Sequence, residues 1–511
     1  MRTTLAEPVT LPGMFATSLA SGALLGFTYP LGRVSFCGSP LWSAVRVMFA
    51  VAALTALHKG PSRQRPRAFA ARWFLAWWMA GCIVLRWLPS AVQYSLEGGA
   101  QPFAIYAAVA AYSAVYAGIA AWCAAKVNLP LYLTMPLLWL VCEWVRGEVG
   151  GGFAWMDLGT VLHAVPPARA LAAVIGARGV GALLLGSTGA LAQVLSAPVT
   201  RRGCVRHAIA LVVVPTALLT FGSRVGPTES HDVVRVGLLH MGAGVSSLPI
   251  GTPRAVFEAY RALAVRVSPQ VDVVVWPEGV FPRPLRALVG EPMRALGATG
   301  AWHLIGALRV ELHQGRVARF NSVAVVDPFG VIRAFHDKRR LVPFVEAPVF
   351  GFSSARTFDR GGDARLLPAP GRPLPLLCYE STTPHSSTST EGPGFLALAS
   401  SERFQSNSAE PWQQLAQAQL RAAEEGRALV RVSTEDYAAV LDADGAVRTL
   451  FEGDVPEAHI VRVLARTGRT PFMAMGWCSS LLVCVVLLAQ ALACRWAERV
   501  NKRETNFDRV L

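Results

Sequence analysis

The sequence predicts a multi-pass α-helical membrane domain joined to an α/β domain that lies outside the cytoplasm. Of the 511 residues, 53% are hydrophobic and only 16% are charged, a composition typical of membrane proteins. Long apolar segments recur along the first 223 positions, whereas 224–470 carries short apolar runs separated by amphipathic stretches. Basic residues gather in every second connection between the apolar segments, and this asymmetry indicates the orientation in the membrane.

The apolar segments are long enough to cross a bilayer as helices, which takes roughly 20 residues each. We expect spans near 12–31, 38–57, 71–90, 102–124, 128–146, 176–197, 206–223 and 473–494. Arg178 interrupts the start of the sixth span, so 165–177 is also compatible with an interfacial helix. Before the first span only Arg2 is basic and no small-residue cleavage site follows, which favours an uncleaved first span over a signal peptide.

The net charge of +15 is concentrated beside the spans. Residues 224–469 hold 27 basic and 25 acidic side chains, whereas the remaining segments hold 21 basic and 8 acidic ones. This distribution is a membrane-orientation signal and argues against a nucleic-acid partner. Because the second, fourth and sixth connections and the C-terminal tail are basic, both termini are predicted to be cytoplasmic.

Four regions follow from this pattern: 1–223 with about seven transmembrane helices, 224–470 as the α/β domain, 471–494 as a C-terminal transmembrane helix, and 495–511 as a basic cytoplasmic tail. Strands are expected at 234–239, 271–276, 303–308, 322–326, 374–377, 394–399 and 429–432. Helices are expected at 253–267 and at 410–426, where Pro411 and Gly426 punctuate the ends. Asp327–Gly330 predicts a hairpin turn.

The cysteines single out one position. Eight of the nine lie in or next to apolar spans, and Cys378 is alone in the α/β domain. No CxxC pair is present, so neither a zinc site nor an internal disulfide framework is supported, and no metal or organic cofactor is indicated. Taken alone, such a cysteine is more often a small core residue than a nucleophile.

Three reactive groups follow predicted strands. Glu278 ends a buried run, Lys338 follows another strand with Glu346 eight residues later, and Cys378 precedes Tyr379-Glu380. A carboxylate can take a thiol proton, and a fixed cation can stabilise the oxyanion of a tetrahedral acyl intermediate. Singly, Glu278 fits an exposed turn and Lys338 a solvated basic patch; the combination favours nucleophilic catalysis.

In this order and context, Glu278, Lys338 and Cys378 resemble the Glu-Lys-Cys triad of the nitrilase (carbon–nitrogen hydrolase) superfamily. With membrane spans on both sides, the resemblance narrows to the apolipoprotein N-acyltransferase family. Further matches to that family are Leu138–Gly147 with Gly152–Trp155, Lys338–Glu346, Phe320–Ser322 and Arg421–Arg427.

The resemblance implies a four-layer αββα domain on the periplasmic face of the bacterial inner membrane. It implies acyl transfer from a phospholipid, typically phosphatidylethanolamine, to a diacylglyceryl-apolipoprotein through a thioester on Cys378. Glu278 would be the base and Lys338 the oxyanion stabiliser. Glu346 and Glu380 would orient Lys338 and the pocket, which Tyr379 would help to shape.

In the membrane half, Glu143 and Arg146 are three residues apart at the end of a span and can share one helix face. A structural ion pair is one explanation of Arg146, and a contact with the lipid headgroup is the other.

The chain also departs from the family pattern. Val345 stands where the family usually has glycine and Arg340 where it has histidine, and the Asn-Asp-x-Trp-Phe-Gly segment is replaced near Ser400–Gln405. Two other functions therefore stay open. One is a membrane-tethered amidase with water as the acceptor, and the other is a non-catalytic membrane binding protein with a degenerate nitrilase domain.

Overall fold

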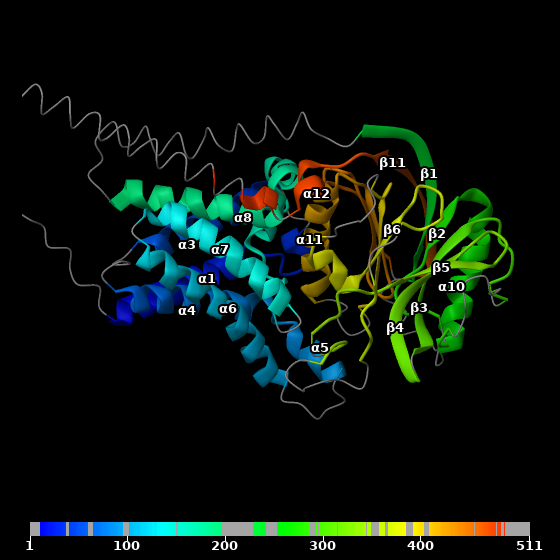
Figure 1. The fold of residues 1–511 in the computed structure, drawn as a ribbon, viewed down its shortest axis with the longest axis horizontal. Helices are drawn as coiled ribbons and strands as arrows, with labels where there is room; N and C mark the ends of the chain where they lie inside the picture. Colours follow the sequence, from blue (N-terminus) through cyan, green and yellow to red (C-terminus); the bar gives the residue numbers. More distant parts are fainter. Residues whose placement is uncertain are drawn as a thin grey trace, which may run out of the picture.

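The structure is a computed structural model of the chain, shown in Figure 1. It describes residues 11–36, 40–59, 65–95, 102–127, 129–149, 152–196, 228–241, 253–281, 283–285, 293–294, 296–313, 315–343, 345–348, 357–362, 366–384, 392–402, 408–453, 455–476, 478–481 and 485. The predicted span 206–223, most of the span 473–494 and the tail 495–511 lie outside these residues.

The N-terminal part is a bundle of helices that occupies one end of the molecule in Figure 1. Its elements are α1 (Leu11–Gly26), α2 (Arg33–Phe36), α3 (Pro40–His58), α4 (Pro66–Val84), α5 (Leu88–Ser95), α6 (Pro102–Lys126), α7 (Leu131–Glu148), the 3₁₀ helix η2 (Leu158–Leu162) and α8 (Pro166–Ser196). Among the described helices, α3, α6 and α8 are long and apolar enough to cross a membrane. Small side chains on α6, such as Ala114 and Ala117, are buried and let it pack closely against its neighbours.

Helix α8 is kinked at Gly176, where φ is +72° and ψ is 163°. A side chain at this position would be strained, and a Cβ atom would come within 2.3 Å of the Phe472 ring. The kink separates 166–175 from 177–196, which is the point where the sequence left two alternatives for the sixth span.

The C-terminal part contains two sheets. The first has the strand order β11-β1-β2-β3-β4-β5, and the second has the order β10-β9-β8-β7-β6. The strands are β1 (Thr228–His240), β2 (Val273–Val275), β3 (Trp302–His313), β4 (Arg316–Val326), β5 (Ile332–Asp337), β6 (Leu374–Leu377), β7 (Leu396–Ser400), β8 (Leu429–Ser433), β9 (Ala438–Leu441), β10 (Val447–Phe451) and β11 (Glu457–Thr467). Helices α10 (Pro253–Val267), α11 (Glu410–Glu425) and α12 (Pro471–Met475) accompany them.

The sheets and helices form four layers in the order α, β, β, α. Helix α10 packs through Phe257 on the outer face of the first sheet, next to Trp276. The inner faces of both sheets meet in one core, which includes Val236 of β1 and Val430 of β8. On the other side, α11 covers the second sheet through residues such as Leu415. This layer order agrees with the four-layer arrangement expected from the resemblance.

Helix α11 lies between the second sheet and the helical bundle (Figure 1). Its other face packs on α8, where Leu420 and Ala423 share a core with Leu171 and Ile175. All its residues are buried, and it ends at Gly426 in the left-handed conformation that commonly closes helices. Helix α11 therefore connects the second sheet with the helical bundle.

The expected strands and both expected helices are present. The observed ends differ from the expected ends by at most six residues, with the largest differences at the beginnings of β1 and β4. The Asp327–Gly330 turn joins β4 to β5, and its Asp327 carboxylate accepts hydrogen bonds from the backbone N–H groups of Phe329 and Val331. No ranges were predicted for strands β5, β9, β10 and β11, although Lys338 was expected to follow a strand. Three of them carry exposed polar positions that interrupt the apolar pattern.

Candidate active site

The three predicted reactive groups follow three strands that end in the same region. Glu278 comes after β2, Lys338 directly follows β5, and Cys378 directly follows β6. Strands β2 and β5 belong to the first sheet and β6 to the second. The site therefore forms where the ends of the two packed sheets meet.

Lys338 lies between two carboxylates. Its Nζ atom is 3.0 Å from Glu278 Oε1 and 2.9 Å from Glu346 Oε1, and its side chain is 1% exposed. A buried ammonium is tolerated only when it is paired and hydrogen-bonded. Both conditions hold here, so the ammonium is fixed in one place.

Asn321, on β4, completes this arrangement. Its Nδ2 donates to Glu278 Oε1 at 2.6 Å and to Glu346 Oε1 at 3.0 Å. Phe320-Asn-Ser322 was a family match in the sequence, but no role was predicted for the Asn321 amide. The second Glu346 oxygen accepts from the backbone N–H of Val342, so both carboxylates have a fixed orientation.

Cys378 lies at the turn from β6 into the 3₁₀ helix η5 (Cys378–Thr382). Its φ of 43° is in the left-handed region, which a non-glycine residue rarely adopts. Such strain recurs at functional sites, where the surrounding structure holds the residue in place. The Cys378 residue as a whole is half-buried.

The ionisation of the three groups is coupled. Desolvation, and then the negative charge of Glu278, raise the pKa of the Cys378 thiol well above its usual value, while Lys338 lowers it. Desolvation also raises the pKa of Glu278, against the opposing charge of Lys338. Desolvation alone would lower the pKa of Lys338, but Glu278 and Glu346 raise it well above the ordinary lysine value. The resting site thus holds a protonated thiol beside a cationic lysine.

Glu380 connects the lysine loop with the cysteine turn. One of its oxygens accepts from the Arg339 backbone N–H and the other from the Leu377 backbone N–H, both at 2.9 Å. His336 lies 3.3 Å from the same carboxylate. Glu380 therefore holds together the segment next to Lys338 and the segment next to Cys378.

Tyr379 points into the helical bundle. Its hydroxyl accepts from the Ala154 backbone N–H and donates to the Gly152 carbonyl, both at 3.2 Å. Its ring is stacked on Trp155. The residue next to Cys378 is thus part of the contact between the bundle and the second sheet.

Several polar residues near Cys378 were not predicted from the sequence. Gln414 on α11 lies with Nε2 3.6 Å from Cys378 Sγ. Arg431 on β8 forms a buried ion pair with Glu402, and Glu410 begins α11 with one buried oxygen that has no hydrogen-bond partner. Desolvation raises the pKa of Glu410 to about 8. One signal that could have found Arg431 is a charged side chain in the middle of the short apolar strand β8.

Arg146 is buried at the end of α7, with its guanidinium 2.7 Å from Asp157 Oδ1 and 3.1 Å from the Phe153 carbonyl. Arg178 holds the other oxygen of Asp157. Glu143 instead accepts from the Leu158 backbone N–H. The ion partner of Arg146 is therefore Asp157 rather than Glu143, which favours the structural explanation over the headgroup contact.

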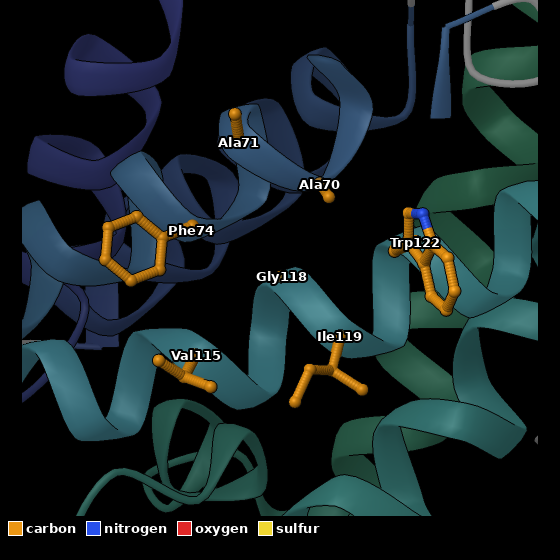
Figure 2. A pocket seen from close by; sticks show the side chains of 7 residues that line it. All are labelled: Ala70, Ala71, Phe74, Val115, Gly118, Ile119 and Trp122. Atoms are coloured by element: carbon orange, nitrogen blue, oxygen red, sulfur yellow. The ribbon is translucent and has the colours of Figure 1, made fainter. Parts of the chain in front are cut away.

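Away from this site, an apolar groove of about 300 Å³ lies between α4 and α6. Figure 2 shows Phe74 and the two alanines Ala70 and Ala71 on one side, and Val115, Ile119 and Trp122 on the other. Its lining has no reactive side chain. Within the described residues, no group of His, Cys, Asp and Glu is arranged to hold a metal ion.

Comparisons with known proteins agree with the resemblance seen in the sequence. Residues 21–190 match the model of the apolipoprotein N-acyltransferase N-terminal domain. An apolipoprotein N-acyltransferase of Bradyrhizobium diazoefficiens is 28% identical over 71% of this chain and 72% of its own length. The apolipoprotein N-acyltransferase of Vibrio vulnificus is 25% identical over 94% of this chain and 97% of its own.

Among solved structures, a carbon–nitrogen hydrolase from Helicobacter pylori covers 45% of this chain and 89% of its own, with 15% identity and a TM-score of 0.34. The family model and the relatives together span both the helical bundle and the two sheets. The chain is therefore similar to apolipoprotein N-acyltransferases over most of its length, and residues 21–190 match the model of their N-terminal domain.

Proposed function

We propose that the protein transfers an acyl chain from a membrane phospholipid to the N-terminal amine of an apolipoprotein, in lipoprotein maturation. Cys378 is the nucleophile, Glu278 the base and Lys338 the oxyanion stabiliser. The observation that carries this proposal is the fixed position of Lys338 Nζ, 3.0 Å from Glu278 and 2.9 Å from Glu346. Both Lys338 and Glu278 act electrostatically on the Cys378 thiol.

In the first half-reaction, Glu278 takes the thiol proton while Cys378 Sγ attacks the carbonyl carbon of the sn-1 acyl ester. A base is needed because the thiol is protonated at rest. The negative charge that develops on the carbonyl oxygen is stabilised by the Lys338 ammonium. The carbon–oxygen bond then breaks, Glu278 returns the proton to the leaving oxygen, and a lysophospholipid departs from the thioester.

In the second half-reaction, the free α-amine of the diacylglyceryl-cysteine attacks the thioester carbonyl. Glu278 accepts a proton from the amine, the carbon–sulfur bond breaks, and the proton returns to Cys378. The raised pKa of Glu278 makes it a stronger base than an ordinary carboxylate. Glu346, Glu380 and Tyr379 hold the lysine and the cysteine turn in position.

We place the protein in the bacterial inner membrane, with several spans and the two-sheet domain on the periplasmic side. The basic connections between apolar segments support this orientation. The apolar helices α3, α6 and α8 support membrane insertion. A two-chain lipid leaves a bilayer reluctantly, because each buried methylene contributes about 0.8 kcal/mol. A site that contacts the bundle through Tyr379 gives such a lipid access without full extraction.

The decisive experiment incubates purified protein with a phosphatidylethanolamine that carries a labelled sn-1 acyl chain, with and without a diacylated lipopeptide. We expect label on Cys378 without the acceptor and on the lipopeptide amine with it. Label retained on protein after Cys378→Ser, with normal transfer, would overturn the assignment. Release of free fatty acid alone would favour the amidase, and absence of any acyl-enzyme would favour a non-catalytic binding protein.

A further inference from the structure

One side chain that contacts the Cys378 sulfur belongs to neither sheet. Gln414 extends from α11, and its amide nitrogen Nε2 lies 3.6 Å from Cys378 Sγ, within hydrogen-bond distance for sulfur. Gln414 is fully buried. A buried amide has to use its donors within the protein, because no water replaces a lost partner.

The orientation of this amide is fixed by its other end. Gln414 Oε1 accepts from the Ser400 hydroxyl at 2.9 Å and from Arg431 Nε at 3.2 Å. A guanidinium has donors and no acceptor, so the group facing Arg431 must be the amide oxygen. The NH₂ group consequently faces the sulfur. Flipping the amide would place two donors against each other.

Arg431 is itself held in place. Its Nη1 donates to the Tyr437 carbonyl at 2.9 Å, and its guanidinium pairs with Glu402. The Arg431 side chain is 0% exposed. A continuous set of contacts therefore runs from Glu402 through Arg431 and Gln414 to Cys378. It holds the donor in position before any substrate binds, which is the condition for effective electrostatic stabilisation.

We propose that Gln414 is a further catalytic residue, which donates a hydrogen bond to Cys378 Sγ and stabilises the negative charge on the sulfur. This inference rests on the proposed function, in which Cys378 is the nucleophile. The charge arises twice: when the thiol loses its proton to Glu278, and when the thiolate leaves the thioester. Gln414 gains and loses no proton in either step.

The charges around Cys378 explain why a neutral donor matters here. Glu278 beyond β2, Glu402 beyond β7 and Glu410 on α11 all raise the pKa of the thiol, and Lys338 beyond β5 lowers it. Lys338 is already shared by Glu278 and Glu346. A hydrogen bond from Gln414 opposes the carboxylates without adding charge to a buried site.

The test measures the thiol directly. Full-length protein in detergent is treated with iodoacetamide between pH 7 and pH 11, a range that extends upward because the pKa of the Cys378 thiol is raised. Carbamidomethylation of the Cys378 peptide is followed by mass spectrometry, because the chain has nine cysteines. Gln414→Leu removes the donor, and Gln414→Glu keeps an oxygen for Ser400 and Arg431 while replacing the NH₂ group. We expect both variants to raise the pH midpoint of Cys378 alkylation by about one unit. At pH values below the midpoint, this corresponds to an alkylation rate about tenfold lower.

Gln419→Leu is the matched control. Gln419 is also buried on α11, but it contacts His163 and the Gly445 carbonyl instead of Cys378. Its loss should affect stability and leave the midpoint of Cys378 alkylation unchanged. Acyl-enzyme formation should slow in the Gln414 variants with little change in KM, because the hydrogen bond strengthens as charge develops.

An unchanged alkylation midpoint in folded Gln414→Leu and Gln414→Glu would overturn this inference. If one of them does not fold, the other decides, since each removes the donor by a different change. Failure of the proposed function gives a different result: Cys378→Ser would then retain acyl transfer. Loss of transfer in Cys378→Ser with unaltered midpoints in the Gln414 variants would refute only the role of Gln414.

Discussion

The ring of Tyr379 is stacked on the ring of Trp155, with centroids 6.1 Å apart and an interplanar angle of 3°. Tyr379 follows the proposed nucleophile, and Trp155 follows α7 in the helical bundle. Trp155 also donates to Gln413 on α11. The position of Cys378 thus depends on the contact between the bundle and the second sheet.

Tyr379→Phe should weaken this contact but keep the stacking. It removes the hydroxyl that pairs with the Ala154 N–H and the Gly152 carbonyl, and leaving such buried groups unpaired costs about 1–3 kcal/mol. We expect a lower thermal midpoint and slower acyl-enzyme formation. Tyr379→Leu should lower both the thermal midpoint and the rate of acyl-enzyme formation further, because the aromatic contact with Trp155 is also lost. Equal behaviour of the two variants would show that stacking contributes nothing.

The pH dependence of acyl-enzyme formation should have an acidic limb only. Activity rises as Glu278 loses its proton, at a pH above the ordinary carboxylate pKa because burial raises its pKa. Lys338 stays charged across the working range because its pKa is raised. Single-turnover rates between pH 5 and pH 9 measure this limb.

Glu346→Gln should move that limb to lower pH. The Glu346 charge is one of the causes that raise the pKa of Glu278, and the variant removes it while an amide oxygen still faces Lys338. Wild-type protein measured in parallel is the control. A limb displaced to higher pH would contradict the assignment of Glu278 as the base.

Glu410→Gln should stabilise the protein at alkaline pH. The pKa of Glu410 is raised from 4.5 to about 8, chiefly by burial. When the pKa of a carboxyl is higher in the folded state than in the unfolded state, the protein loses stability as the pH rises from the unfolded-state pKa through the folded-state pKa. Thermal midpoints at pH 5.5 and pH 8.5 should therefore diverge less in the variant. Glu258→Gln, at an exposed position on α10, should leave the divergence unchanged.

Arg146→Ala should lower stability without raising the KM for phospholipid. The guanidinium is 2% exposed and bound to Asp157, and removing one partner of a buried ion pair costs about 3–5 kcal/mol. Because Arg178 also pairs with Asp157, we expect the loss of stability to lie at the lower end of this range. Thermal midpoints and phospholipid titrations measure the two quantities. A raised KM at unaltered stability would restore the headgroup explanation.

The sequence by itself determined the elements with a clear period and clear ends. Helix α11 has Pro411 in its first turn and Gly426 at its end, and its predicted range differs from the observed one by a single residue. Strands with uninterrupted apolar runs, such as β2 and β6, were also predicted. The sequence named Glu278, Lys338 and Cys378 as well, because reactive side chains directly after buried runs are an unusual local pattern.

The tertiary structure alone decided which groups meet these three. Gln414 is one polar residue among several on a helix rich in glutamine, and nothing in its neighbours in sequence indicates Cys378, which lies 36 positions away. The partner of Arg146 was likewise open, because helix spacing brings Glu143 within reach while the loop after α7 supplies Asp157. Local pattern specifies secondary structure, whereas partners distant in the chain are chosen by packing, here by the burial of α11 between bundle and sheet.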